Sequence, residues 1–127
     1  MLLCFSDDDG LTWSTPSQMI TDAHYPTVWT SFADGNLWIG AVKFVSGSAA
    51  PCNIVAKRQG PGDAAMGSQF TFKDDAGADM EFEDDTFHVS SALDSSGRCV
   101  LAAVAYGSTD VSEWESFDLC ATWTLIG

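Results

Sequence analysis

Positive charge is scarce in this chain of 127 residues, which has only five lysines and arginines against eighteen aspartates and glutamates. The formal net charge at pH 7 is −13. Nucleic acids and anionic membrane surfaces are recognised through clustered cations, so we expect neither as a partner. The acidity also has a simpler interpretation, because a high net charge of one sign keeps a small domain soluble.

Long apolar runs and metal-binding motifs are missing as well. No stretch approaches the length of a membrane span, and residues 1–6 lack the basic start and the apolar run of a secretory leader. The four cysteines, Cys4, Cys52, Cys99 and Cys120, show no C-x-x-C or Cys/His spacing. We therefore expect no zinc and no other cofactor, with calcium at the acidic segment 74–85 as the one alternative.

Helical periodicity is the third absence. No segment repeats its apolar residues every 3.6 positions over three turns, and the chain instead alternates short β-rich segments with turns. Asp34 and Gly35, for example, separate the β-rich residues 27–32 and 37–45 and predict a hairpin. Hydrophobic residues make up 46% of the chain, enough for a packed core. The sequence predicts an all-β fold.

One motif is repeated. The stretch SDDDGLTW at residues 6–13 returns as SFDLCATW at residues 116–123, with Cys120 in place of Gly10. The segments 33–44 and 95–106 also correspond to each other as hairpins. Repeats of roughly 50 to 65 residues with four strands each are typical of β-propeller blades.

The pattern S-x-D-x-G-x-T-W resembles the Asp-box, or BNR repeat, of sialidase-like β-propellers. This resemblance implies a structural motif between the third and fourth strands of a blade, away from the ligand face. The residue types fit such a turn, because aspartate accepts backbone hydrogen bonds, glycine adopts positive φ and tryptophan covers the hairpin. We expect this structural role, and no catalysis, for Ser6, Asp8, Gly10, Thr12, Trp13, Ser116, Asp118, Thr122 and Trp123.

The resemblance divides the chain into about two and a half blades of four antiparallel strands. Residues 1–22 form the second half of a blade with the full Asp-box, and residues 23–75 form a complete blade with a degenerate turn. Residues 76–127 form a complete blade with the degenerate Asp-box. Propellers close with about four to eight blades. The chain is therefore expected to be part of a longer propeller or to form a homo-oligomer by exchanging strands.

Blade geometry also brings two cysteines together. The turn before the second strand and the turn after the third strand share one end of a blade, and these two strands are neighbours. Cys99 and Cys120 are therefore expected to lie close to each other. Both a disulfide and two buried free thiols agree with this placement.

The opposite end carries the ligand-binding loops in the family, which here include the acidic connector 74–85 and the loop 107–114. Tyrosine and tryptophan suit stacking on sugar rings, and carboxylates accept hydrogen bonds from hydroxyl groups. Alternatively, the aromatic residues serve ordinary packing, and the histidines occupy incidental surface positions without a role in binding. The acids at 79, 81 and 83 share one face of an extended segment. They could serve as calcium ligands, or they could belong to a loop that is exposed to water. The candidate residues are His24, Tyr25, Asp79, Glu81, Glu83, Asp84, Asp85, His88 and Trp114.

Catalysis of the sialidase type is not expected from this chain alone. The family holds its acidic substrate with three arginines, whereas the chain has only Arg58 and Arg98, both expected near the Asp-box end. The resemblance therefore implies a non-catalytic segment that binds a glycan or a protein partner, in an extracellular or virion-surface protein. A section of an exo-acting glycoside hydrolase with its catalytic residues elsewhere is the first alternative, and a purely structural propeller module is the second.

Overall fold

The structure, a computed structural model, describes residues 1–31, 33–47, 49–91 and 96–127, without the side chains of residues 84–86 and 91. Within these residues the chain contains strands and no helix, which confirms the all-β fold class. No helix that could cross a membrane occurs in this described part. The strands are β1 (Leu2–Leu3), β2 (Ser17–Gln18), β3 (His24–Thr30), β4 (Leu37–Ser46), β5 (Ala49–Gln59), β6 (Phe70–Thr71), β7 (Lys73–Asp74), β8 (Phe82–Ser91), β9 (Cys99–Ala105), β10 (Val111–Ser116) and β11 (Thr122–Leu125).

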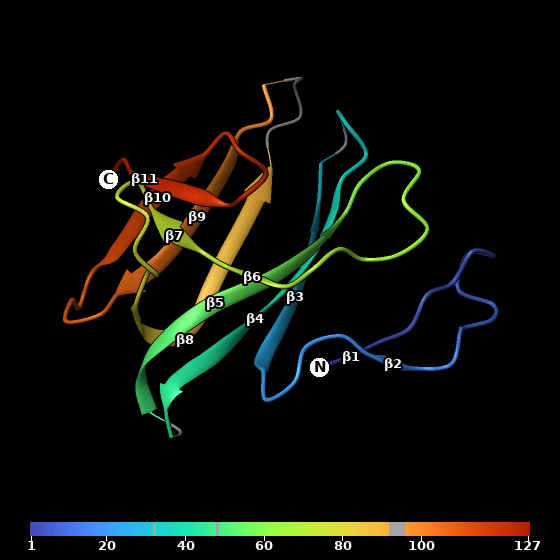
Figure 1. The fold of residues 1–127 in the computed structure, drawn as a ribbon, viewed down its shortest axis with the longest axis horizontal. Helices are drawn as coiled ribbons and strands as arrows, with labels where there is room; N and C mark the ends of the chain where they lie inside the picture. Colours follow the sequence, from blue (N-terminus) through green and yellow to red (C-terminus); the bar gives the residue numbers. More distant parts are fainter. Residues whose placement is uncertain (32, 48, 92–95) are drawn as a thin grey trace.

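Two antiparallel meanders make up most of the molecule (Figure 1). The first meander pairs β3, β4, β5 and β6 in chain order, and the second pairs β8, β9, β10 and β11 in the same way. The meanders share one backbone pair, between Cys52 of β5 and Phe82 of β8. β7 follows the first meander and runs parallel to β11, where Lys73 lies beside Thr122.

The main hydrophobic core lies between these meanders. Alternate residues of β9, namely Cys99, Leu101 and Ala103, are buried in it, as expected for a strand with one face toward the core. Trp29 of β3 stacks on Trp38 of β4 with ring centroids 6.0 Å apart. Burial of a single large apolar side chain contributes roughly 1.5–3 kcal/mol, so this layer is the main source of stability.

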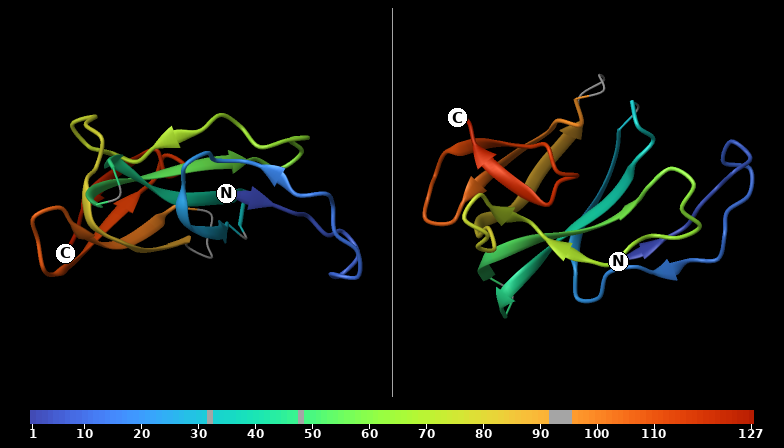
Figure 2. Two further views of the ribbon diagram at one scale, coloured as in Figure 1. Left: turned by 90° about the horizontal axis from the view of Figure 1, so that it is seen from below. Right: turned by 45° about the horizontal axis from the view of Figure 1, so that its top comes forward.

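A smaller core covers the other face of the first meander. The hairpin of β1 and β2 lies on the side away from the second meander, as Figures 1 and 2 show. Ile20, which follows β2, is buried against Ala41 of β4 and Val55 of β5, and Met1 and Met19 pack around them. The hairpin, the first meander and the second meander therefore follow one another as three packed layers.

Two expected loops turn out to contain strand. The acidic segment 74–85 was expected to connect strands, but β8 begins at Phe82, which is buried and paired with Cys52. The segment 107–114 was expected to be a loop, but β10 begins at Val111. The start of β8 is fixed by pairing with the distant strand β5, and the start of β10 by pairing with Val104 of the preceding strand β9; local composition reveals neither pairing.

Candidate functional site

The first acid-and-tryptophan turn, residues 6–13, is closed by its own hydrogen bonds. Asp8 Oδ1 accepts from the Thr12 amide at 2.8 Å and from Ser6 Oγ at 2.9 Å, and Asp8 Oδ2 accepts from Thr12 Oγ1. Ser6 Oγ accepts from the Gly10 amide at 2.8 Å, and the Trp13 indole donates to the Gly10 carbonyl at 3.1 Å. Every side chain of the motif thus serves the turn itself.

The second turn, residues 116–123, repeats this arrangement. Asp118 accepts from the Thr122 amide at 2.9 Å, from Thr122 Oγ1 at 2.6 Å and from Ser116 Oγ at 2.8 Å. The Trp123 indole donates to the Cys120 carbonyl at 3.0 Å. The two stretches that align in the sequence are therefore also equivalent in geometry.

These bonds keep both aspartates ionised. The hydroxyl and the amide of Thr12 lower the pKa of the Asp8 carboxyl below its ordinary value. Burial raises the pKa of Asp118, but the hydrogen bonds from Thr122 and Ser116 outweigh it, and the net change is again downward. A carboxylate that is ionised and saturated with local donors is poorly suited to proton transfer. The geometry is that of a structural clamp.

The two turns differ in their surroundings. The Trp13 ring is 64% exposed, whereas the Trp123 ring is 1% exposed and packs on Phe72 with centroids 4.8 Å apart. The second turn is also tied to the first meander, because the Trp38 indole donates to the Leu119 carbonyl at 3.2 Å. One turn is thus docked on a neighbouring sheet, and the other projects into solvent (Figure 1).

The opposite end of the sheets is defined by a row of paired residues. Phe44 of β4 pairs with Cys52 of β5, Cys52 pairs with Phe82 of β8, and Phe82 pairs with Ala105 of β9. This row crosses both meanders and lies far from the turn between β3 and β4 (Figure 1). We call this row, together with the start of β3 beside it and the residues that flank the row on β8 and β9, the open end.

His24 and Tyr25 lie at this open end. The His24 ring contacts Phe44 with centroids 5.2 Å apart and Tyr25 at 6.4 Å. Tyr25 is 57% exposed, and its backbone has a φ of +52° at the irregular pairing between His24 and Thr27. Such a conformation is uncommon for a bulky residue and is often found at ligand sites. The structure therefore presents an exposed ring where the sequence predicted a ligand contact.

The acidic connector alternates as the sequence predicted. Asp79, Glu81 and Glu83 are exposed, while Met80 and Phe82 between them are buried. This alternation places the three carboxylates on the solvent face of one extended segment.

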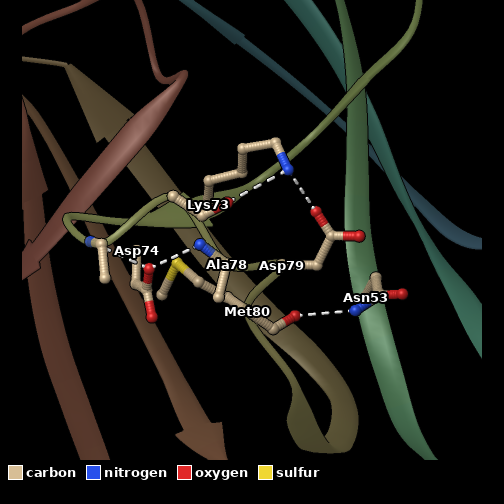
Figure 3. A network of polar contacts seen from close by, with 8 residues as sticks. Asn53, Lys73, Asp74, Ala78, Asp79 and Met80 are labelled. Atoms are coloured by element: carbon tan, nitrogen blue, oxygen red, sulfur yellow. Dashed lines mark hydrogen bonds and ion pairs between the residues drawn. The ribbon is translucent and has the colours of Figure 1, made fainter.

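The carboxylates do not converge on one point. Asp79 accepts from Lys73 Nζ at 2.7 Å, as Figure 3 shows, and Glu83 accepts from the Gly107 amide at 3.0 Å. The side chains of Asp84 and Asp85 lie outside the described part of the chain. In that described part, no cluster of three or more His, Cys, Asp or Glu side chains could hold a metal ion.

Two other candidates lie further along their strands, because Trp114 pairs with Leu101 and His88 pairs with Ala102 of β9. Trp114 is only 8% exposed and packs edge-on against Phe82 with centroids 5.7 Å apart, so its faces are not available to a ligand. His88 lies within β8, where it is exposed and paired with Ala102. Trp114 is therefore a core residue, which agrees with the alternative that this aromatic side chain serves ordinary packing.

Tyr106 is an open-end residue that the sequence reasoning missed. It follows Ala105 directly, is 52% exposed, and donates its amide to the Glu81 carbonyl at 2.9 Å. The sequence did contain a pattern that indicates this position, because Tyr106 ends an apolar segment and is followed by a glycine. Gly107 has a φ of +80°, which is typical of a turn after a strand. Both tyrosines of the chain therefore lie at the open end.

The arginines lie at the other end and are engaged there. Arg58 Nη1 donates to Asn36 Oδ1 at 2.6 Å, and Arg98 Nε donates to Glu115 at 2.8 Å. A surface hollow of about 290 Å³ is lined by neutral side chains, none of them a candidate residue: Phe5, Met19, Gln59, Ala64, Ala65 and Met66.

Comparisons with models of protein families, with curated proteins and with solved structures give no match.

Proposed function

We propose that this chain is a segment of an Asp-box β-propeller that binds an uncharged carbohydrate through its open end without catalysing a reaction. The observation that carries the proposal is the exposure of Tyr25 and Tyr106 at the open end, where Tyr106 also joins the acidic connector through the Glu81 carbonyl. Exposed tyrosine rings stack on the apolar faces of sugars, and carboxylates accept hydrogen bonds from sugar hydroxyls.

The propeller part of the proposal is supported by the layer order. A hairpin and two four-stranded meanders pack face to face in chain order, in agreement with a division at residues 1–22, 23–75 and 76–127. The exposed ring of Trp13 supports a partial propeller, because its equivalent Trp123 is covered by the preceding sheet. A further sheet would come from a longer chain or from a second copy.

The charge distribution argues against catalysis of the sialidase type. Arg58 and Arg98 are paired at the clamped end, and the open end carries Glu81 and Glu83. An acidic sugar brought there would meet carboxylates without an arginine partner, which opposes its binding. We therefore expect neutral glycans to bind better than sialylated ones.

A glycan array tests the proposal. Wild-type protein should bind a subset of neutral glycans, and Tyr25→Ala or Tyr106→Ala should each weaken binding about fivefold, since one stacked ring contributes about 1 kcal/mol. Trp13→Ala is the matched control, because it removes an equally exposed ring at the other end and should leave binding unchanged.

Three outcomes would contradict the proposal. Preference for sialylated glycans would reverse the charge argument, and binding that depends on Trp13 but on neither tyrosine would move the site to the other end. No binding to any glycan would favour a protein ligand or a purely structural module.

A further inference from the structure

The second clamped turn contains a residue that its geometry does not favour. Cys120 has a φ of +68°, and the equivalent Gly10 has a φ of +84°. Glycine adopts this region freely, whereas a residue with a Cβ is penalised by roughly 1 kcal/mol. The side chain of Cys120 is nevertheless completely buried, so its contacts must compensate for the unfavourable backbone.

The main contact of Cys120 is another cysteine. Cys99 of β9 is 1% exposed and pairs across the strands with Ser116, the first residue of the turn. Both cysteines are free thiols in the main hydrophobic core, together with Trp29 of the first meander. The interaction between the two thiols lowers the pKa of Cys99 and raises the pKa of Cys120. The two cysteines thus lie where β9, the turn and the first meander meet.

We propose that Cys99 and Cys120 are a disulfide-forming pair that locks the second clamped turn to β9. The oxidant is a low-molecular-weight disulfide such as glutathione disulfide. The Cys99 thiolate attacks one sulfur of the oxidant, a mixed disulfide forms, and one glutathione thiolate leaves. Cys120 then loses its proton and attacks the Cys99 sulfur, and the second glutathione thiolate leaves. Both cysteines are oxidised, and one glutathione disulfide is reduced to two thiols.

The order of the two steps follows from the thiol contact. The hydrogen bond from Cys120 lowers the pKa of Cys99, while the same bond and burial raise the pKa of Cys120. Cys99 is therefore the thiol that ionises first and attacks first. Because both sulfurs are buried, exchange requires local opening or takes place during folding.

The disulfide would close a loop that contains the whole of β10 and most of the turn. It would hold the Leu119 carbonyl at its hydrogen bond to the Trp38 indole, which joins the two meanders. A loop of about 20 residues closed in this way should lower the unfolding equilibrium constant about a hundredfold.

Refolding in a glutathione redox buffer tests the proposal. Alkylation in denaturant followed by mass spectrometry should leave only Cys4 and Cys52 labelled, and a peptide map should show Cys99 linked to Cys120. The double variant Cys4→Ser/Cys52→Ala should still form the bond. Cys120→Gly, which restores the residue type of the first turn, should prevent it while allowing the chain to fold.

The rate at which the cysteines are oxidised gives a second measurement, which needs no variant. Native protein should oxidise at least tenfold more slowly than the unfolded chain, because the pair is buried. Label on all four cysteines after refolding in oxidised glutathione would overturn the proposal. A bond from Cys99 or Cys120 to either of the other cysteines would overturn it as well.

Discussion

The two tryptophans of the repeated motif offer a test within one molecule. Trp13 and Trp123 make the same indole hydrogen bond to the residue three positions earlier, at 3.1 Å and 3.0 Å. Only Trp123 is buried, against Phe72. Truncation of a buried tryptophan to alanine costs roughly 3–5 kcal/mol, whereas truncation of an exposed one costs less than about 1 kcal/mol. Trp123→Ala should therefore lower the free energy of unfolding about 3 kcal/mol more than Trp13→Ala does.

Urea unfolding followed by far-ultraviolet circular dichroism measures this difference. With an m-value of about 2 kcal/mol/M, Trp123→Ala should lower the midpoint by about 2 M, while Trp13→Ala should move it by less than about 0.5 M. Trp123→Phe keeps a ring against Phe72 and provides an intermediate case if the alanine variant does not fold. Equal losses at positions 13 and 123 would refute the docking of the second turn on the first meander.

Three further predictions concern packing and charge. Gly40→Ala would place a Cβ 2.7 Å from the Trp29 ring, so thermal melting should show a loss of roughly 1–3 kcal/mol; unchanged melting would contradict this packing. The lowered pKa of Asp118 means that its carboxylate stabilises the fold above about pH 4 and that this stabilisation disappears as the pH falls further. Between pH 5 and pH 2.5, Asp118→Asn should therefore lose less free energy of unfolding than wild type, as measured by urea unfolding. An equal loss of free energy of unfolding in Asp118→Asn and in wild type would contradict the structural role of the Asp118 carboxylate in the turn. Arg98→Ala should cost less than about 1 kcal/mol, because its ion pair with Glu115 is partly exposed, and a larger loss in urea unfolding would assign it a structural role.

Local turn chemistry explains what could be predicted. Asp34 and Gly35 lie in the turn between β3 and β4, as the sequence indicated, and Gly35 has a φ of +72°. The two acid-and-tryptophan motifs form equivalent turns because all their hydrogen bonds lie within eight residues. Strand order also explains why Cys99 pairs with Ser116, the first residue of the turn that contains Cys120, since neighbouring strands bring their ends together.

Burial at the candidate site could not be predicted in the same way. Trp114 and Tyr25 are both aromatic residues within strands, but one packs against Phe82 in the core and the other is exposed. Tyr106 belongs to the open end only because β9 pairs with β8 and brings it beside Glu81. These placements depend on which distant strands pair, and composition does not specify such pairing.

The sequence by itself determined the elements whose energetics are local: short strands, the Asp-Gly hairpin and two turns clamped by an aspartate. Tertiary structure alone decided which of the two motifs is buried, because Trp13 and Trp123 occupy the same position in the motif but have different neighbours in space. It also decided that both tyrosines share one end of the molecule. Contacts between sheets arise from segments far apart in the chain, so only the folded arrangement fixes them.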